Sequence, residues 1–272
     1  MSKRIKTIIL YLVLIIIALF FIFPFVWMLS TSFKGSENLF TYPPQWIPQN
    51  PTLENFRVVF RRVPIVRYFF NTLKITAVGL TLNILLSTLA AYPLGRLDFI
   101  GRKFIFALII APMLIPMQGT MIVNYVTLRS LGLVNTHLGV VITSAVFIFG
   151  VFLLKQAYEA IPIEIEEAAR IDGCGEFRIW WQIMTPMIKP SVAAVSIFSF
   201  VMYWNSFMWP LIVLKDNDLY PLTLGLTALE SAFEGNFRYV SAGAVIMIIP
   251  ILIFFYFTQR FFIEGYKGAV KG

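Results

Sequence analysis

The sequence predicts an all-α membrane protein with six transmembrane helices, organised as a single domain over residues 1–272. Composition is the first observation behind this prediction. Hydrophobic residues make up 58% of the chain and charged residues only 13%, whereas soluble domains are about 45–50% apolar and about 25% charged. The second observation is a set of six long stretches with almost no charge, each near the roughly 20 residues that a helix needs to cross a bilayer.

The six predicted spans are, in chain order, residues 8–29, 75–95, 104–128, 138–154, 190–214 and 239–259. The first span follows Lys3, Arg4 and Lys6, as the apolar part of a signal peptide would. Its apolar core exceeds the usual length of about 7–15 residues, and no small-residue cleavage site follows Trp27. We therefore expect a retained first helix.

Proline and glycine interrupt the third predicted span, which contains Pro112, Pro116 and Gly119. Proline removes a helical hydrogen bond, so these residues predict a kink or a break there.

The distribution of Lys and Arg predicts the orientation in the membrane. With the N-terminus inside, the inner connections hold thirteen of these residues and the outer connections eight, of which five lie in the long first outer loop. Cytoplasmic connections carry an excess of Lys and Arg, and long loops follow this rule less strictly. Both termini are therefore predicted to be cytoplasmic. The same rule explains the net charge of +8, so we do not expect a nucleic-acid partner.

The inner connection over residues 155–189 is unusual because it is acidic. It holds six Asp and Glu against four Lys and Arg, so attraction to anionic lipid does not explain it. Pro162 suits the first turn of a helix, and Gly173 sits where a left-handed C-terminal cap would fall. A second short helix over about 175–184 should stop before Pro186. We therefore predict a cytoplasmic helix–glycine–helix unit.

Within this unit, Glu167-Ala168-Ala169 is followed after three residues by Gly173, after nine more by Ile183, and then by Pro186. This spacing resembles the signature loop of the permeases of ATP-binding-cassette (ABC) importers, E-A-A-x3-G-x9-I-x-L-P. Thr185 stands where the pattern has Leu, and we interpret this change as one of local packing.

Further motifs resemble the sugar-importing branch of that family. They are Ile161–Gly173, Trp204–Phe207 with Trp209–Leu211, and Glu264–Gly272, of which the last resembles the six-span permease of maltose-type importers. The resemblance runs through the whole chain. It implies a type I ABC importer permease fold, with a coupling helix between spans 4 and 5, that moves a sugar or oligosaccharide by alternating access.

The resemblance also implies partners. They are a second permease that forms a heterodimer with this chain, two ATP-binding-cassette ATPases and an extracytoplasmic solute-binding protein, for which the outer loop over 215–238 is a candidate contact. The complex would lie among the lipids of the plasma (inner) membrane of a prokaryote. ATP and Mg would bind to the ATPases, because this chain has no G-x-x-x-x-G-K-[ST] phosphate loop. No cofactor, metal or catalytic residue is expected on this chain.

The residues expected to contact the ATPases lie on the helix–glycine–helix unit and on the C-terminal tail. Small side chains on the helix surface would let a partner's backbone approach, and neighbouring charges would add charge-assisted contacts. The coupling set is Glu167, Ala168, Ala169, Arg170, Asp172 and Gly173, and the tail set is Gly265, Lys267, Gly268 and Lys271. By resemblance the tail reaches into the ATPase dimer, and a frayed basic tail is the alternative.

Polar residues within the spans mark a candidate solute pathway, because such residues face a cavity or a neighbouring helix. Serines and a tyrosine recur on one face of the fifth span. That face holds Ser196, Ser199, Tyr203 and Ser206, and the candidate solute contacts are Asn83, Ser199, Tyr203 and Asn205. Bridging of helices by these hydroxyls is the alternative, and the resemblance also allows the solute site to lie mainly on the partner permease.

Three other functions remain open at this point. An ABC importer for peptides, amino acids or phosphate would differ only in cargo, and the Trp204–Asn205 segment and the tail favour sugar. A polytopic enzyme acting on lipid needs paired acids or His–acid sets at the membrane face, whereas the inner acids sit on the predicted docking helix. A proton-driven transporter needs an Asp or Glu within a span, and the six predicted spans contain none.

Overall fold

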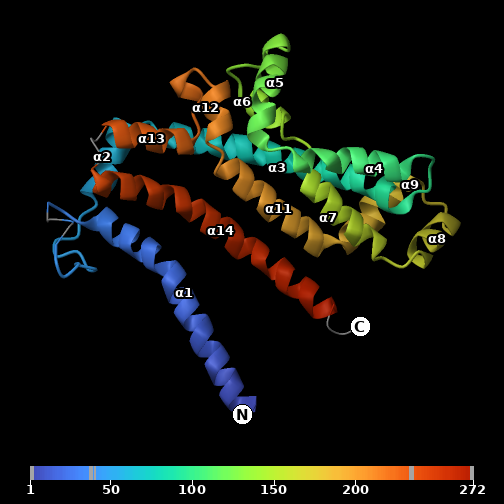
Figure 1. Cartoon of the computed structure of the whole chain (residues 1–272), viewed down its shortest axis with the longest axis horizontal. Coiled ribbons are helices and arrows are strands. Elements are labelled where there is room, and N and C mark those ends of the chain that lie inside the picture. The colour runs from blue at the N-terminus through green and yellow to red at the C-terminus, as the bar shows by residue number, and fades with distance from the viewer. Residues whose placement is uncertain (1–2, 37–38, 40, 233–235, 270–272) are drawn as a thin grey trace. The chain divides into compact units, whose positions relative to one another are not determined.

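The computed structural model describes residues 3–36, 39, 41–232 and 236–269, which form helices and turns without a β-strand (Figure 1). In chain order the α-helices are α1 (Lys3–Phe33), α2 (Glu54–Arg62), α3 (Ile65–Arg96), α4 (Arg102–Ile110), α5 (Met117–Ser130), α6 (His137–Ile142), α7 (Ile148–Glu159), α8 (Glu164–Ile171), α9 (Glu176–Arg178), α10 (Thr185–Met187), α11 (Lys189–Trp204), α12 (Met208–Val213), α13 (Leu222–Ala232) and α14 (Phe237–Ala269). A π-helix, η2, covers Ile179–Met184, and two 3-10 turns, η1 and η3, cover Ala111–Leu114 and Asn217–Leu219.

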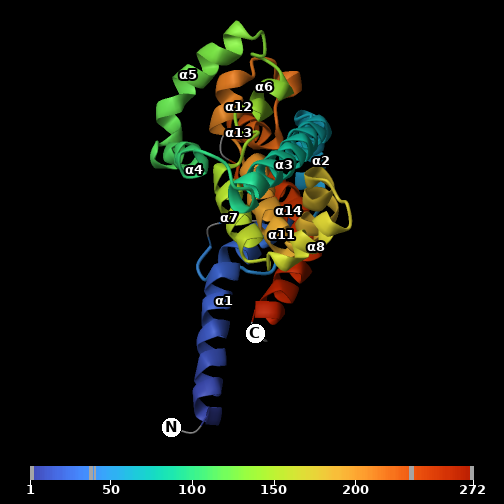
Figure 2. The ribbon, with the colours of Figure 1, turned by 90° about the vertical axis from the view of Figure 1, so that its right-hand side faces the viewer.

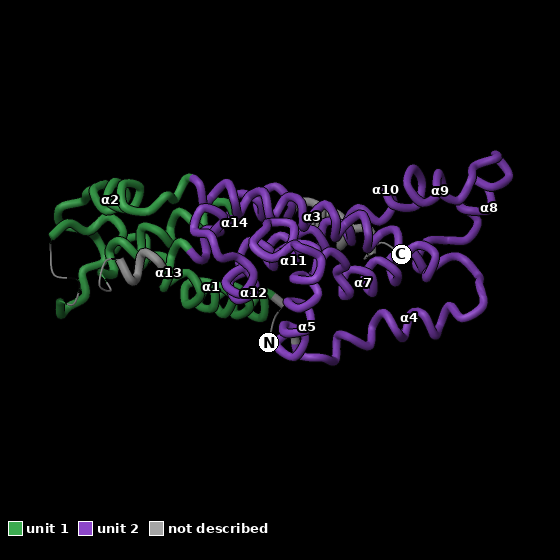
Figure 3. The backbone as a smooth tube through the Cα atoms, turned by 90° about the horizontal axis from the view of Figure 1, so that it is seen from above, with its two compact units in different colours: residues 1–66, 225–250 green, residues 67–224, 251–272 purple. Residues whose placement is uncertain are grey.

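The chain divides into two compact units, unit 1 (Met1–Val66 and Gly225–Pro250) and unit 2 (Arg67–Leu224 and Ile251–Gly272), which Figure 3 colours separately. In unit 1, the Asn55 amide of α2 donates hydrogen bonds to the carbonyls of Ser32 and Lys34, at 2.9 and 2.8 Å. These bonds hold the C-terminal end of α1 against α2. The Lys34 ammonium lies over the ring of Trp27, 4.3 Å from its centroid.

Within the described residues, three helical stretches are long and apolar enough to cross a membrane: Arg4–Phe33, Ile65–Arg96 and Phe237–Gln259. Two bent helix pairs, Arg102–Leu114 with Gln118–Ser130 and Glu176–Met187 with Lys189–Trp204, would bring the number of crossings to five. The predicted fourth span, 138–154, is divided between α6 and α7, so six crossings stay a prediction. Every residue from Arg4 to Val26 of α1 is exposed, as expected of a helix that is apolar all round and surrounded by lipid.

The third predicted span breaks at Pro116, as its proline content predicts. A proline pushes the preceding residue out of the helical region, and Ile115 is extended, with φ −93° and ψ 123°. Helix α4 and the η1 turn end before this point and α5 begins after it, which makes the corner visible in Figure 2.

The fifth predicted span, 190–214, is wrong as a continuous helix. Helix α11 ends at Trp204, residues 205–207 are not helical, and α12 begins at Met208. Ser206 therefore lies outside the helical face predicted for it. Its carbonyl instead accepts a hydrogen bond from the Thr223 hydroxyl at 2.6 Å.

The second helix of the inner loop also differs from the prediction, because it does not stop before Pro186. The chain continues through η2 and α10 to Met187 and then bends by 83° into α11. Pro186 is tolerated because it lies in the first turn of α10, where a missing N–H costs little. The elbow packs on the core of unit 2, in which Leu154 and Tyr158 of α7 and Ile179 and Met184 of η2 are fully buried.

Candidate functional site

The predicted helix–glycine–helix unit is present as α8, the turn at Gly173, and α9, which we call the coupling unit (residues 164–178). Gly173 has φ +80°, the left-handed conformation that glycine adopts at little steric cost. Its N–H donates to the carbonyl of Arg170 at 3.0 Å, and that of Cys174 donates to the carbonyl of Ala169 at 2.9 Å. The prediction of a left-handed cap at Gly173 is confirmed.

The outward side of α8 combines acidic and apolar side chains. Glu167, Ala168 and Asp172 are exposed, and the Ile171 side chain beside them is 86% exposed.

The expectation that Ala169 lies on the surface of α8 is wrong. Ala169 is only 6% exposed and belongs to the core cluster that includes Ile179 and Trp180. The reason is helical periodicity, since Ala169 follows Ile165 by one turn on the inner side of the helix.

The Arg170 side chain is 38% exposed and also forms ion pairs within the coupling unit, so its contact with a partner stays a prediction. Its Nε donates to Glu176 Oε1 at 2.8 Å, and its Nη2 donates to Glu166 Oε2 at 3.3 Å. The guanidinium therefore ties α8 to the start of α9 across the Gly173 turn.

The hydrogen bond from Arg170 lowers the pKa of the Glu176 carboxyl, and the same bond raises the pKa of Arg170. Because the pKa of Glu176 is lowered, the resulting stabilisation is fully present above the ordinary carboxyl pKa. It is lost as the pH falls through the lowered value.

A buried ion pair joins the coupling unit to the end of α3. Arg96 Nε donates to Glu166 Oε1, and the two side chains are 6% and 0% exposed. Arg96 Nη1 also donates to the carbonyls of Tyr158 and Ile161, at 3.2 and 2.8 Å. One turn earlier on α3, the Tyr92 hydroxyl donates to Glu176 Oε2 at 2.7 Å.

The sequence pattern alone did not reveal this network. Arg96 is one of the thirteen inner Lys and Arg residues, and Glu166 is one of the six acids of the inner connection. One signal could have found the contact, because Glu166 lies between Ile165 and Ala169 on the inner side of α8. A carboxylate there needs a buried basic partner, but the sequence does not show which one.

The tail residues can be placed only in part. Gly265, Lys267 and Gly268 continue α14 as backbone helix, which the structure describes to Ala269, and Lys271 lies outside the described residues.

The candidate pathway residues do not form one open site. Asn83 of α3 donates from Nδ2 to the hydroxyl of Tyr203 of α11 at 3.0 Å, and that hydroxyl donates to the Ser144 carbonyl at 2.8 Å. Asn83 and Ser199 are 0% exposed and Tyr203 is 4% exposed. Asn205 lies apart from them, exposed at the end of α11. In this conformation Asn83 and Tyr203 join α3 to α11, whereas the buried Ser199 hydroxyl has no hydrogen-bond partner among the described residues.

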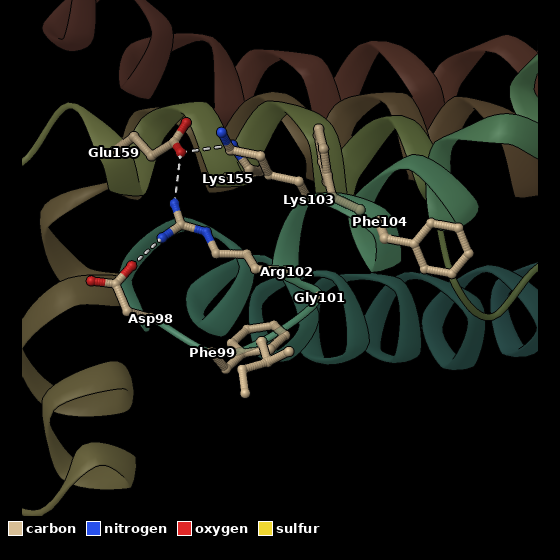
Figure 4. A pocket seen from close by; sticks show the side chains of 10 residues that line it. Asp98, Phe99, Gly101, Arg102, Lys103, Phe104, Lys155 and Glu159 are labelled. Carbon is tan, nitrogen blue, oxygen red and sulfur yellow. Dashed lines mark hydrogen bonds and ion pairs between the residues drawn. The ribbon is translucent and has the colours of Figure 1, made fainter.

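An open pocket of about 890 Å³ lies beside the turn between α3 and α4, and Figure 4 shows its charged side chains. Arg102 binds Asp98 at 3.0 Å and Glu159 at 3.3 Å, and Lys155 binds Glu159 at 2.7 Å. These ion pairs fasten the α3–α4 turn to the end of α7.

Helices long and apolar enough to cross a membrane, joined by a buried polar contact between α3 and α11, define a helical membrane protein. The chain belongs to the family of binding-protein-dependent transport system inner membrane components, whose pattern matches residues 83–267. It is therefore the permease subunit of an ABC importer, a non-catalytic part whose ATPase resides on separate subunits.

Similar proteins cover nearly the whole chain. The arabinooligosaccharides transport system permease protein AraQ of Halalkalibacterium halodurans is 37% identical over 260 residues, which are 94% of this chain and 93% of that protein. The lactose transport system permease protein LacG of Rhizobium radiobacter is 30% identical over 271 residues, covering 100% and 98%. The melibiose/raffinose/stachyose import permease protein MelC of Bacillus subtilis is 35% identical over 254 residues, covering 92% and 91%.

A solved structure confirms the fold class. A chain of a bacterial ABC transporter involved in the import of the acidic polysaccharide alginate matches with a TM-score of 0.83 at 24% identity, covering 96% of this chain and 99% of that one. The predicted all-α importer permease fold is thus confirmed.

Proposed function

We propose that this chain and a second permease form the pathway by which a sugar or oligosaccharide crosses the membrane. Two partner ATPases that bind ATP and Mg drive the transport, and an extracytoplasmic protein delivers the solute. Relatives whose names specify arabinooligosaccharides, lactose and melibiose support a carbohydrate cargo.

The outward side of α8 is the observation that carries the docking of the ATPases in this proposal. Glu167 and Asp172 offer charge to a partner, the small Ala168 lets its backbone approach, and the exposed Ile171 offers apolar area. Arg170 and Gly173 are exposed beside them and are proposed to take part in the same contact, whereas the buried Ala169 acts behind this surface by setting the position of α8.

The proposed orientation places the coupling unit and both termini in the cytoplasm. The tail, with Gly265, Lys267, Gly268 and Lys271, is proposed to extend from α14 toward the ATPases. On the opposite side, the outer connection begins with residues 215–220, where Asp218 pairs with Arg67 of α3.

The proposed solute contacts are Asn83, Ser199, Tyr203 and Asn205. Because three of them are buried, contact with solute requires α3 and α11 to separate during alternating access. If Tyr203 and Asn205 variants import the same solutes with unchanged preference, the direct contact is wrong.

The docking proposal is tested by Ala168→Trp, which places a bulky ring on the exposed side of α8. We expect the membrane domain to assemble while ATPase co-purification falls at least about tenfold, since packing at an interface tolerates no such ring. Ser130→Trp, on the exposed end of α5, is the matched control. Mass spectrometry of solute bound to the wild-type complex tests the cargo, and an amino acid or a peptide there would contradict the sugar assignment.

A further inference from the structure

We propose that Tyr92 and Arg96, at the C-terminal end of α3, are positioning residues that fasten the coupling unit to α3 and carry its movement into the membrane. This inference rests on the proposed docking of the ATPases at α8. It adds the route by which a displacement of α8 reaches a membrane-spanning helix.

The first link is the buried pair between Arg96 and Glu166. The two side chains are 6% and 0% exposed. Water therefore has little access to either group and cannot replace a lost partner. Arg96 also binds the carbonyls of Tyr158 and Ile161, which lie at the end of α7 and in the turn before α8. One guanidinium therefore holds α3, α7 and α8 together.

The second link lies on the other side of the Gly173 turn. The Tyr92 hydroxyl donates to Glu176 at 2.7 Å, and Glu176 accepts a second bond from Arg170 at 2.8 Å. Tyr92 and Arg96 are four residues apart and so share one face of α3. The coupling unit is thus attached to α3 at both of its ends, and Arg170 joins the two attachments through Glu166 and Glu176.

Two attachments restrict the movement of α8 against α3 more than one attachment would. A single contact acts as a pivot and allows α8 to rotate against α3, whereas two contacts on either side of a turn make the unit and the helix end move together. The same helix α3 carries Asn83, which binds Tyr203 of α11. A pull on α8 therefore reaches the polar joint between α3 and α11 through one continuous helix.

The test uses two near-isosteric variants, Glu166→Gln and Tyr92→Phe, which weaken one link each. Each variant is assembled with the second permease and the ATPases in liposomes, and solute imported per ATP hydrolysed is measured together with ATPase co-purification. Asp98→Asn is the matched control, because Asp98 forms an exposed ion pair just beyond the same end of α3.

We expect ATPase co-purification and hydrolysis at the wild-type level with import per ATP reduced about tenfold, within the roughly 5–150-fold range of coupling between sites. A purely structural role would lower the yield of complex and leave the ratio unchanged, which would overturn the inference. If Glu166→Gln fails to assemble, Tyr92→Phe decides alone, since it removes only a hydroxyl. A wild-type complex that imports without any ATPase would contradict the proposed function instead.

Discussion

At the residue scale, a comparison of Gly173 with Gly175 separates two effects of an added side chain. One is strain in the backbone conformation, and the other is a steric clash with neighbouring atoms. A Cβ at either position meets nothing within 4 Å, but Gly173 has φ +80° and Gly175 has φ −73°. We expect Gly173→Ala to lower stability by about 1–2 kcal/mol, the cost of a left-handed non-glycine residue, and to reduce import per ATP. Gly175→Ala is the control and should leave both thermal unfolding and coupling near wild type. Equal effects of the two variants would show that the conformation of Gly173 is not required.

A second pair of glycines tests the packing of α3 on α11. A Cβ at Gly79 would lie 2.4 Å from the ring of Tyr203, whereas one at Gly119 of α5 meets nothing within 4 Å. Overpacking of this kind costs about 1–3 kcal/mol, so Gly79→Ala should lower the unfolding temperature of the purified protein. Gly119→Ala should leave the unfolding temperature unchanged. Unchanged unfolding of Gly79→Ala would mean that α3 and α11 do not approach as closely as described.

At the scale of elements, the Tyr203 hydroxyl joins α11 to α3 and to the turn after α6. It accepts from Asn83 and donates to the carbonyls of Val141 and Ser144, at 3.3 and 2.8 Å. Tyr203→Phe leaves buried partners with fewer bonds, so we expect a loss of about 1–3 kcal/mol in the free energy of unfolding. Tyr256→Phe, at an exposed position of α14, is the control. A stability equal to the control would argue that these bonds are replaced by other contacts.

The elements also show where the sequence pattern is insufficient. The break at Pro116 could be predicted, because a proline changes the backbone of its neighbour whatever the surroundings. The end of α11 at Trp204 and the continuation through Pro186 could not. The end of α11 depends on a polar group that finds a partner elsewhere in the chain, as the Ser206 carbonyl does with Thr223. The continuation depends on where α10 begins relative to Pro186.

At the scale of the whole molecule, the single cysteine offers a test of orientation. Cys174 lies in the Gly173 turn and is partly exposed. In membranes that contain the permeases alone, a membrane-impermeant maleimide should label it in inside-out vesicles and not in intact cells. Tyr42→Cys in a Cys174→Ser background is the control, because Tyr42 is 99% exposed in the connection that is predicted to lie outside. Labelling of Cys174 from outside would reverse the proposed orientation.

Part of the candidate site could be predicted from the sequence and part could not. The left-handed conformation of Gly173 and the exposure of Glu167 and Asp172 follow from local rules. A left-handed cap and a helical period are properties of a few consecutive residues. The partners of Glu166 and Arg170 do not follow. They come from α3 and α9, and only tertiary contact shows that Arg96 is buried against Glu166.

The sequence by itself determined that this protein lies in a lipid bilayer, that its fold is all-α, and which residues form the coupling unit. Composition, apolar length and turn residues act locally and need no knowledge of distant contacts. The tertiary structure decided which side chains are buried together, which helices are broken, and that Arg170 pairs with Glu176. The buried pair of Arg96 and Glu166 joins residues that are 70 positions apart in the chain, and no local pattern encodes such a pairing.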